Sequence, residues 1–245
     1  MASYIDIKGK RFLVTGGSSG LGRETAVQLS RRGALVIVTG RNPEKLAQTL
    51  SLMEGEGHIS HAADLTKADE IAALVDAIQA VDGVVHFAGI SVPMPFRMIS
   101  EKFLDDIIAS NFKSVFLLTQ RLIAKNKINK GGSIVLASSI AAHTGTVGMG
   151  AYSAIKAGLE GVMAPLFLEL APKKIRVNAI APAIVRTEIF TDIQQSWLDE
   201  QEKLYPLGLG RPIDVANAVI FLMSSASSYM TATTLVMDGG CIQVR

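Results

Sequence analysis

The chain has 245 residues, of which 49% are hydrophobic and 19% are charged, and its formal net charge is +2. This length and apolar content suit one large α/β domain that spans residues 1–245 and buries a substantial core. Because neither sign of charge is concentrated in a long run, the sequence argues against a nucleic-acid or an anionic-membrane partner.

Short apolar runs rich in β-branched residues alternate along the chain with longer segments of helical periodicity. This alternation predicts a doubly wound, Rossmann-like parallel sheet of about seven strands flanked by helices. The predicted strands are, in chain order, Arg11–Thr15, Leu35–Thr39, His58–Ala62, Val84–Phe87, Ser133–Ala137, Ile175–Ile180 and Thr234–Met237. The predicted helices are Leu21–Arg32, Pro43–Met53, Lys67–Gln79, Ser100–Ala124, Ala151–Leu170 and Ile213–Met223.

One segment, residues 187–209, departs from this tight alternation. It is polar, contains Trp197 and Tyr205, and follows the end of a predicted strand. Ligands of open α/β sheets bind beyond the carboxyl ends of the strands. The segment is therefore either a lid over a substrate site or a peripheral helix packed by Trp197, and the two interpretations stand equal at this point.

The N-terminal segment does not resemble a signal peptide, because Asp6 and three basic residues fall where an apolar core would lie. No apolar stretch approaches the ~20 residues of a membrane span. The only cysteine, Cys241, excludes an intramolecular disulfide and fits a reducing compartment. We therefore expect a cytoplasmic protein. The histidines lack metal-ligand spacing with cysteine or carboxylate partners, so no metal site is expected.

A glycine-rich turn, Thr15–Gly22, joins the first predicted strand to the first predicted helix. Its glycines at positions 16, 20 and 22 permit a tight turn and let the backbone approach a pyrophosphate, whose charge faces the helix N-terminus. The spacing is G-x-x-x-G-x-G rather than G-x-G-x-x-G, so the place of the turn in the fold supports a dinucleotide site more than the pattern does.

The second predicted strand ends at Thr39-Gly40-Arg41-Asn42. An NAD-preferring site usually carries an acidic residue here, which accepts hydrogen bonds from the ribose 2′-OH. The guanidinium of Arg41 can instead hold a 2′-phosphate through two charge-assisted hydrogen bonds. The alternative is an ordinary solvated arginine. The missing carboxylate favours NADP(H) over NAD(H) as the cofactor.

Tyr152 and Lys156 are four residues apart at the start of a predicted helix, so they share one face with Cβ atoms about 5–6 Å apart. A neighbouring ammonium stabilises the phenolate, lowers the phenol pKa and eases proton delivery. Considered alone, the pair could equally be two ordinary side chains on the surface of a helix. Ser139 follows a predicted strand end, where a hydroxyl can hydrogen-bond a substrate carbonyl. Asn111 lies inside a predicted helix, where asparagine is unfavourable without a compensating role.

In the order and spacing of these residues, the chain resembles the classical short-chain dehydrogenases/reductases over essentially its whole length. The resemblance rests on Thr15–Gly22, Asp64, Ala88-Gly89, Asn111, Ser139, Tyr152, Lys156, Pro182 and Thr187. It implies that Tyr152 is the general acid in carbonyl reduction and that Lys156 tunes Tyr152 and holds the nicotinamide ribose. It further implies that Ser139 polarises the carbonyl and that Asn111 positions a water in the proton relay.

The resemblance also implies contacts to the cofactor outside the glycine turn. Asp64 resembles the family aspartate near the adenine amine, although it can instead cap the helix predicted from Lys67. The segment Pro182–Thr187 resembles the P-G-x-x-x-T segment, which implies contacts from Ile184 and Thr187 to the carboxamide. The expected cofactor-binding residues are Gly16, Ser18, Ser19, Gly20, Leu21, Gly22, Arg41, Asp64, Leu65, Ala88, Gly89, Tyr152, Lys156, Pro182, Ile184 and Thr187.

The chain departs from the family pattern in three places. His86-Phe87 stand where the family commonly has two asparagines, and Ala183 replaces the usual glycine. Pro165 lies within the predicted helix that carries the tyrosine and lysine, where it removes a backbone hydrogen bond and is expected to kink the helix.

The C-terminal runs Pro206–Pro212 and Val236–Gly240 are similar to those of 3-oxoacyl-carrier-protein reductases within this family. We therefore expect an NADPH-dependent carbonyl reductase, with a β-ketoacyl thioester as the leading substrate. The alternatives are an NAD(P)-dependent dehydrogenase of a sugar, polyol or other small secondary alcohol, and a non-catalytic NADP-binding regulatory protein. The family also suggests a homotetramer or, less often, a homodimer.

Overall fold

Parallel strands form one sheet within residues 5–187 and 192–244, the part of the chain that the computed structural model describes. The order in this seven-stranded sheet is β3-β2-β1-β4-β5-β6-β7, which confirms the predicted doubly wound fold. The order in which the strands are added along the chain changes direction between β1 and β4. Open α/β sheets bind ligands at such a position. The strands are β1 (Arg11–Thr15), β2 (Leu35–Gly40), β3 (Ile59–Ala62), β4 (Val81–His86), β5 (Ile128–Ala137), β6 (Arg176–Pro182) and β7 (Thr234–Met237).

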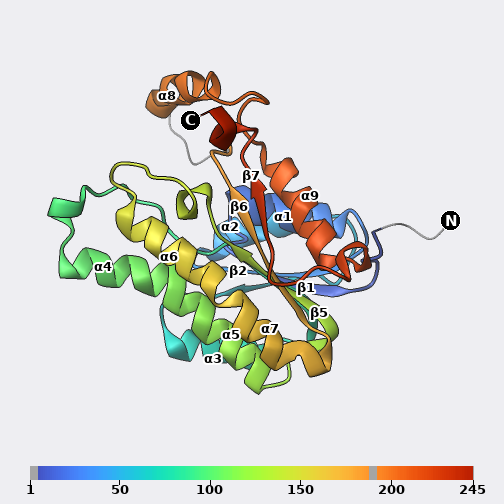
Figure 1. Ribbon diagram of the computed structural model, residues 1–245. Coiled ribbons are helices and arrows are strands. Elements are labelled where there is room, and N and C mark those ends of the chain that lie inside the picture. Colours follow the sequence, from blue (N-terminus) through green and yellow to red (C-terminus); the bar gives the residue numbers. More distant parts are fainter. Residues whose placement is uncertain (1–4, 188–191, 245) are drawn as a thin grey trace.

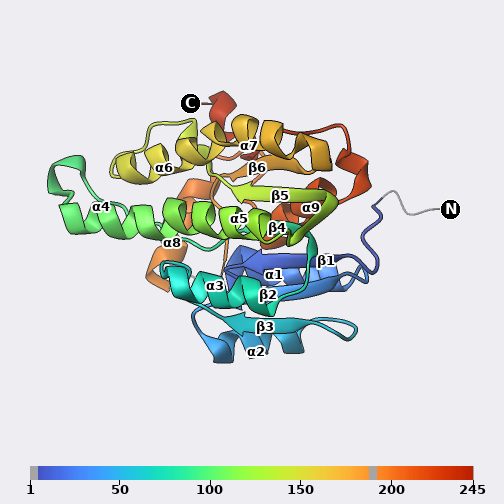
Figure 2. The same ribbon diagram turned by 90° about the horizontal axis from the view of Figure 1, so that it is seen from below.

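Helices cover both faces of the sheet (Figures 1 and 2). One layer consists of α1 (Gly20–Ser30), α2 (Pro43–Ser51) and α9 (Pro212–Met223). The other layer consists of α3 (Ala68–Ala77), α4 (Glu101–Ile108), α5 (Ser114–Ala124), α6 (Gly150–Gly161) and α7 (Met163–Leu170). The remaining helix of the described residues, α8 (Asp192–Glu202), lies beyond the carboxyl end of the sheet (Figure 1).

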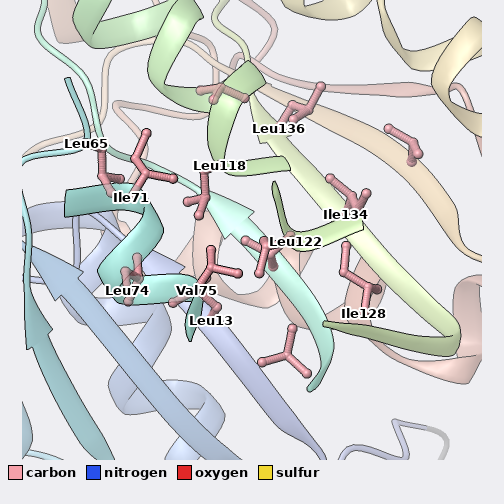
Figure 3. Close-up of a cluster of buried hydrophobic side chains, with 14 of the residues drawn as sticks. Leu13, Leu65, Ile71, Leu74, Val75, Leu118, Leu122, Ile128, Ile134 and Leu136 are labelled. Atoms are coloured by element: carbon pink, nitrogen blue, oxygen red, sulfur yellow. The ribbon is translucent and has the colours of Figure 1, made fainter. Parts of the chain in front are cut away.

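Successive strand residues face opposite helical layers, so both faces of the sheet are buried. Leu13 and Ile134 pack with Leu122 of α5, as Figure 3 shows. Phe12 and Val14, their neighbours in β1, pack instead in the cluster formed with α1 and α9. This period of two, with apolar side chains on both faces, explains why the strands read as continuous apolar runs.

The helix predicted over Ser100–Ala124 is wrong as a continuous α-helix. A π-helical turn, Ala109–Lys113, separates α4 from α5 and contains Asn111. The Nδ2 atom of Asn111 donates to the carbonyl of Ile107 at 3.0 Å, the acceptor that the Asn111 N–H would use in an α-helix. This side-chain bond favours the wider turn, a local irregularity that is frequent at functional sites.

The helix predicted over Ala151–Leu170 is also divided, because α6 ends at Gly161 and α7 begins at Met163. Pro165 has no N–H to donate to the carbonyl four residues earlier, which belongs to Gly161. The predicted effect of Pro165 is therefore a break in the helix. The result leaves Tyr152 and Lys156 on a helix of their own.

Two strands are longer than predicted. β4 begins at Val81 and β5 at Ile128, and these two residues pair across an irregularity before Gly83. The start of β5 was missed because Asn129 and the residues after it are polar and rich in glycine. Other predicted elements end within one or two residues of those observed. Among the described residues, no helix is both long and apolar enough to cross a membrane.

Candidate active site

A cavity of about 1090 Å³ lies at the carboxyl ends of the strands, where the strand order reverses. Loops that follow β1, β2, β3, β4, β5 and β6 line it, together with α6 and α8. The fold therefore brings to one space every site residue expected from the sequence. These lining residues are Gly16, Ser18, Ser19, Gly20, Leu21, Gly22, Arg41, Asp64, Leu65, Ala88, Gly89, Asn111, Ser139, Tyr152, Lys156, Pro182, Ile184 and Thr187.

The turn after β1 is shaped for close approach of the backbone to a ligand. Gly16 and Gly20 have φ values of +66° and +52°, in the left-handed region that favours glycine. A Cβ atom at Gly22 would lie 2.3 Å from the carbonyl oxygen of Gly16. The turn leads into the N-terminus of α1, whose first N–H groups and positive dipole end suit a pyrophosphate. These residues fit a dinucleotide.

Arg41 and Asp64 lie at the end of the cavity formed by the loops after β2 and β3. Arg41 is exposed, and both residues line the cavity. Thr66 donates to Asp64 Oδ1 through its backbone N–H at 3.0 Å and its hydroxyl at 2.8 Å. The backbone bond from Thr66 is the main cause that lowers the pKa of Asp64, and Arg41 contributes as well. Because α3 begins at Ala68 and Asp64 stabilises the turn before it, the helix-cap alternative is wrong.

Three side chains converge where β5 ends beside α6. Lys156 Nζ donates to the carbonyl of Ala137 at 2.6 Å and lies 5.4 Å from the centroid of the Tyr152 ring. Ser139 Oγ accepts a hydrogen bond from the N–H of Ala141 at 3.2 Å. The Ser139 hydroxyl is also near enough to Tyr152 to act on the pKa of its phenol. A hydroxyl, a phenol and an amine therefore share one wall of the cavity.

Burial controls the protonation of this group. Lys156 is 7% exposed, and burial lowers the pKa of its ammonium to about 8. Burial also raises the pKa of Tyr152, and the neighbouring Ser139 hydroxyl opposes this effect without cancelling it. The expected lowering of the Tyr152 pKa is therefore not observed in the structure, because removal of the phenol from water dominates. The phenol stays protonated at neutral pH, as a proton donor must.

Asn111 holds the loop after β4 in place. Its Oδ1 accepts a hydrogen bond from the N–H of Ile90 at 3.0 Å, and the residue is 1% exposed. A Cβ atom at Gly89 would lie 2.3 Å from that same oxygen. The compensating role expected for a helical asparagine is thus visible as a bridge between the π turn and the loop. The water position implied by the family stays a prediction.

The comparisons with known proteins agree with this geometry. A family model described as enoyl-(acyl carrier protein) reductase matches residues 16–241, and a 3-oxoacyl-[acyl-carrier-protein] reductase of Rickettsia bellii is 36% identical over 242 residues. The chain belongs to the short-chain dehydrogenase/reductase family. The match to the Rickettsia protein covers 98% of this chain and 100% of that relative.

Two further similarities place this short-chain dehydrogenase/reductase. A (3R)-3-hydroxyacyl-CoA dehydrogenase of Canis lupus familiaris is 34% identical over 257 residues, covering 98% of this chain and 99% of the relative. A short-chain type dehydrogenase/reductase from Mycobacterium ulcerans has a similar structure, with a TM-score of 0.89 and 32% identity over 98% of this chain and 92% of that one. The protein is an NAD(P)-dependent oxidoreductase that acts on a carbonyl or an alcohol.

Among the residues that depart from the family pattern, His86 has a partner of its own in this short-chain dehydrogenase/reductase. His86 is buried, with its Nε2 3.0 Å from the hydroxyl of Thr119 on α5, and burial lowers its pKa to about 3. Thr15 Oγ1 accepts a hydrogen bond from the N–H of Ala88 at 3.0 Å. The end of β4 is thus held by a neutral imidazole and a threonine. Ala183 lines the cavity.

The sequence did not predict some of the residues that line the cavity. The loops after β4 and β5 contribute most of it, and a position beyond a strand end was the only signal in the sequence. In the part of the chain that the structure describes, the charged residues of the whole lining are Arg41, Asp64 and Lys156. The additional wall residues include Ile90, Ser91, Pro93, Thr144, Thr146, Val147, Met149, Trp197, Gln201 and Tyr205.

Helix α8 lies within the segment 187–209, of which residues 188–191 are outside the described part. Trp197 lines the cavity and is 46% exposed. Among the side chains of α8 that the structure describes, Leu198 is fully buried, in a cluster with Tyr205, Leu209 and Cys241. The interpretation of a peripheral helix packed by Trp197 is therefore wrong about the packing residue.

Proposed function

We propose that this enzyme is an NADPH-dependent carbonyl reductase in which Tyr152 donates the proton, and that its substrate is a 3-oxoacyl thioester. The observation that carries the proposal is the convergence of Ser139, Tyr152 and Lys156 on one wall of the cavity. When it is bound, the nicotinamide supplies the hydride. The residues of the chain provide placement, proton and charge.

Each of the three side chains has a distinct role in this proposal. Ser139 donates a hydrogen bond to the substrate carbonyl oxygen and so polarises the carbonyl. Tyr152, kept protonated by burial, transfers its proton to the same oxygen as negative charge develops there. The Lys156 ammonium stabilises the phenolate that remains and holds the nicotinamide ribose. Asn111 keeps the loop after β4 at the cavity.

Arg41 supports NADPH over NADH. Its exposed guanidinium stands at the end of β2, where an NAD-preferring site usually carries a carboxylate. Hydrogen bonds to a charged group contribute about 1.5–3 kcal/mol, so Arg41→Ala should weaken NADPH binding on the order of 10- to 100-fold. NADH, which lacks the 2′-phosphate, should bind almost as before. Equal losses for both cofactors in a fluorescence titration would refute the preference.

The charge distribution of the cavity favours a neutral substrate. Among the described lining residues, charges occur at Arg41 and Asp64 in the adenosine part and at Lys156 in the catalytic group. The remaining wall mixes apolar side chains with hydroxyl and amide groups, which suits an uncharged carbonyl compound. The names of two similar proteins specify 3-oxoacyl and 3-hydroxyacyl substrates, which supports a thioester.

The segment 187–209 acts in this proposal as a lid over the substrate. Trp197 and Gln201 of α8 reach the cavity wall. Arg186 connects this helix to the cofactor-binding segment through ion pairs with Asp199 at 3.0 Å and Glu202 at 3.1 Å. The assembly as a homotetramer or homodimer and the cytoplasmic location stay predictions. Light scattering after size exclusion tests the assembly, and a monomer would contradict it.

The deciding experiment is the initial rate of NADPH oxidation with a short β-ketoacyl thioester, beside NADH and a Tyr152→Phe control. We expect turnover with NADPH that is largely lost in the variant, while the variant still binds NADPH. Near-wild-type rates in Tyr152→Phe would exclude this tyrosine as the acid. No turnover despite NADPH binding would favour a sugar or polyol substrate, or a non-catalytic regulatory role.

A further inference from the structure

A third residue continues the face of α6 that carries Tyr152 and Lys156. Glu160 follows Lys156 by four residues, as Lys156 follows Tyr152, so the three side chains lie above one another on one side of the helix. This side of α6 faces the end of β5. The face therefore has three points of contact with the strand end, of which the proposed chemistry uses two.

The three contacts involve three consecutive residues, Ala137–Ser139. The first binds Lys156 through its carbonyl, and the third, Ser139, is near enough to Tyr152 to lower the pKa of its phenol. The middle one, Ser138, is 4% exposed, and its hydroxyl donates to Oε1 of Glu160. Contacts at Tyr152 and at Glu160, one helical turn before and one after Lys156, thus hold α6 in register with the end of β5.

The same oxygen of Glu160 also contacts the loop that follows Ser139. His143 Nε2 lies 3.0 Å from Oε1, and the Glu160 side chain is only 17% exposed. His143 directly follows the short 3-10 turn Ile140–Ala142, which Ser139 caps. One carboxylate oxygen therefore joins the end of β5, helix α6 and the start of this loop.

The loop matters because its residues form the wall of the substrate part of the cavity. Thr144, Thr146, Val147 and Met149 all line it. At its other end, the loop contacts a second loop at the cavity mouth, where the N–H of Met94 donates to the carbonyl of Gly148 at 2.8 Å. A shift of the loop at its start would move both the wall and the serine hydroxyl.

We propose that Glu160 is a positioning residue, which fixes Ser139 and the loop after it against Tyr152 through its contacts with Ser138 and His143. The inference rests on the proposed catalytic roles of Ser139 and Tyr152. Both contacts use a single oxygen as acceptor, so the requirement is for an acceptor at this point and not for a negative charge. Glutamine should therefore replace Glu160, whereas leucine, which has a similar volume and no acceptor, should not.

The first test compares Glu160→Leu with Glu160→Gln, with Glu56→Leu as the matched control at an exposed carboxylate in the turn between α2 and β3. A misplacement of about 1 Å can lower a rate 10²-fold. We expect Glu160→Leu to lower kcat on the order of 10- to 100-fold. The dissociation constant for NADPH should change little, because the glycine turn and Arg41 are untouched. Glu160→Gln should keep most of the wild-type kcat.

The second readout does not depend on turnover. Hydrogen exchange of the amides of residues 139–149, measured by mass spectrometry, should be faster in Glu160→Leu than in wild type and unchanged in Glu160→Gln. Unchanged exchange in Glu160→Leu overturns the inference, and so does equal damage by leucine and glutamine. If the wild type reduces no carbonyl compound, the proposed function fails, and the exchange experiment still decides this inference. If Glu160→Leu does not fold, His143→Leu beside His143→Gln makes the same comparison from the loop side.

Discussion

Replacing Lys156 by methionine should change how the stability of the protein depends on pH. The ammonium is buried, its hydrogen bond goes to the carbonyl of Ala137, and burial lowers its pKa from the ordinary 10.5 to about 8. The folded state therefore releases this proton at lower pH than the unfolded state does. Wild-type stability should rise with pH between about 8 and 10.5, because in this range the unfolded chain binds more protons. Methionine removes this contribution.

The size of the burial penalty follows from the lowered pKa of Lys156. One pKa unit corresponds to about 1.4 kcal/mol, so the lowered pKa of Lys156 implies a burial penalty of about 3 kcal/mol at neutral pH. Between pH 7 and pH 10 the penalty should fall by about 2–3 kcal/mol. The hydrogen bond lost in Lys156→Met costs about 1–3 kcal/mol at every pH. The net change at pH 7 is therefore small, and the pH dependence is the quantity that tests the reasoning.

The assay is urea denaturation of wild type and Lys156→Met at pH 7 and pH 10. The difference in unfolding free energy should move in favour of wild type by about 2–3 kcal/mol as the pH rises. Other titrating groups are common to both proteins and cancel in the difference. Lys130→Met, at an exposed lysine in β5, is the control and should show little change. A difference that stays constant for Lys156→Met would refute the view that burial, and not pairing, governs this lysine.

Three further predictions concern the cofactor turn, the loop after β4 and the buried histidine. Gly22→Ala places a Cβ atom 2.3 Å from the carbonyl oxygen of Gly16. Because overpacking costs about 1–3 kcal/mol, NADPH should bind on the order of tenfold more weakly in a fluorescence titration. An unchanged affinity would contradict the interpretation that the backbone of this turn holds the cofactor. Gly89→Ala should displace Asn111 and lower kcat while leaving the far-ultraviolet spectrum unchanged; a normal kcat would show that the Asn111 contact is dispensable. His86 is held neutral with a pKa of about 3, whereas the unfolded chain takes up the proton as the pH falls. Wild type should therefore lose about 2 kcal/mol of unfolding free energy between pH 7 and pH 5, and His86→Gln should not. Equal acid sensitivity of the two proteins in urea denaturation would contradict this prediction.

The strand period of two and the helical period both identified real elements. They failed at Pro165, at the polar start of β5 and at Asn111, whose side chain competes with the backbone. The strand β1 and the start of α2 are predicted to the residue, because apolar runs and Pro43 mark them directly. The break after Gly161 follows from Pro165, although the sequence placed a kink and not an end there. The π turn at Asn111 has no periodic signal, because it depends on a bond from the asparagine amide to its own helix.

The sequence by itself determined the order of the strands along the chain, the glycine turn and the types of residue proposed for catalysis, because these depend on local periodicity and on short spacings. It also placed the glycine turn and Ser139 just beyond strand ends, which the parallel topology brings to one cavity. Tertiary structure decided the remainder. The raised pKa of Tyr152 reflects burial, and the contact of Glu160 with Ser138 and His143 joins segments that are distant in sequence. Desolvation and long-range hydrogen bonds arise only once the chain is folded, because they depend on which residues meet.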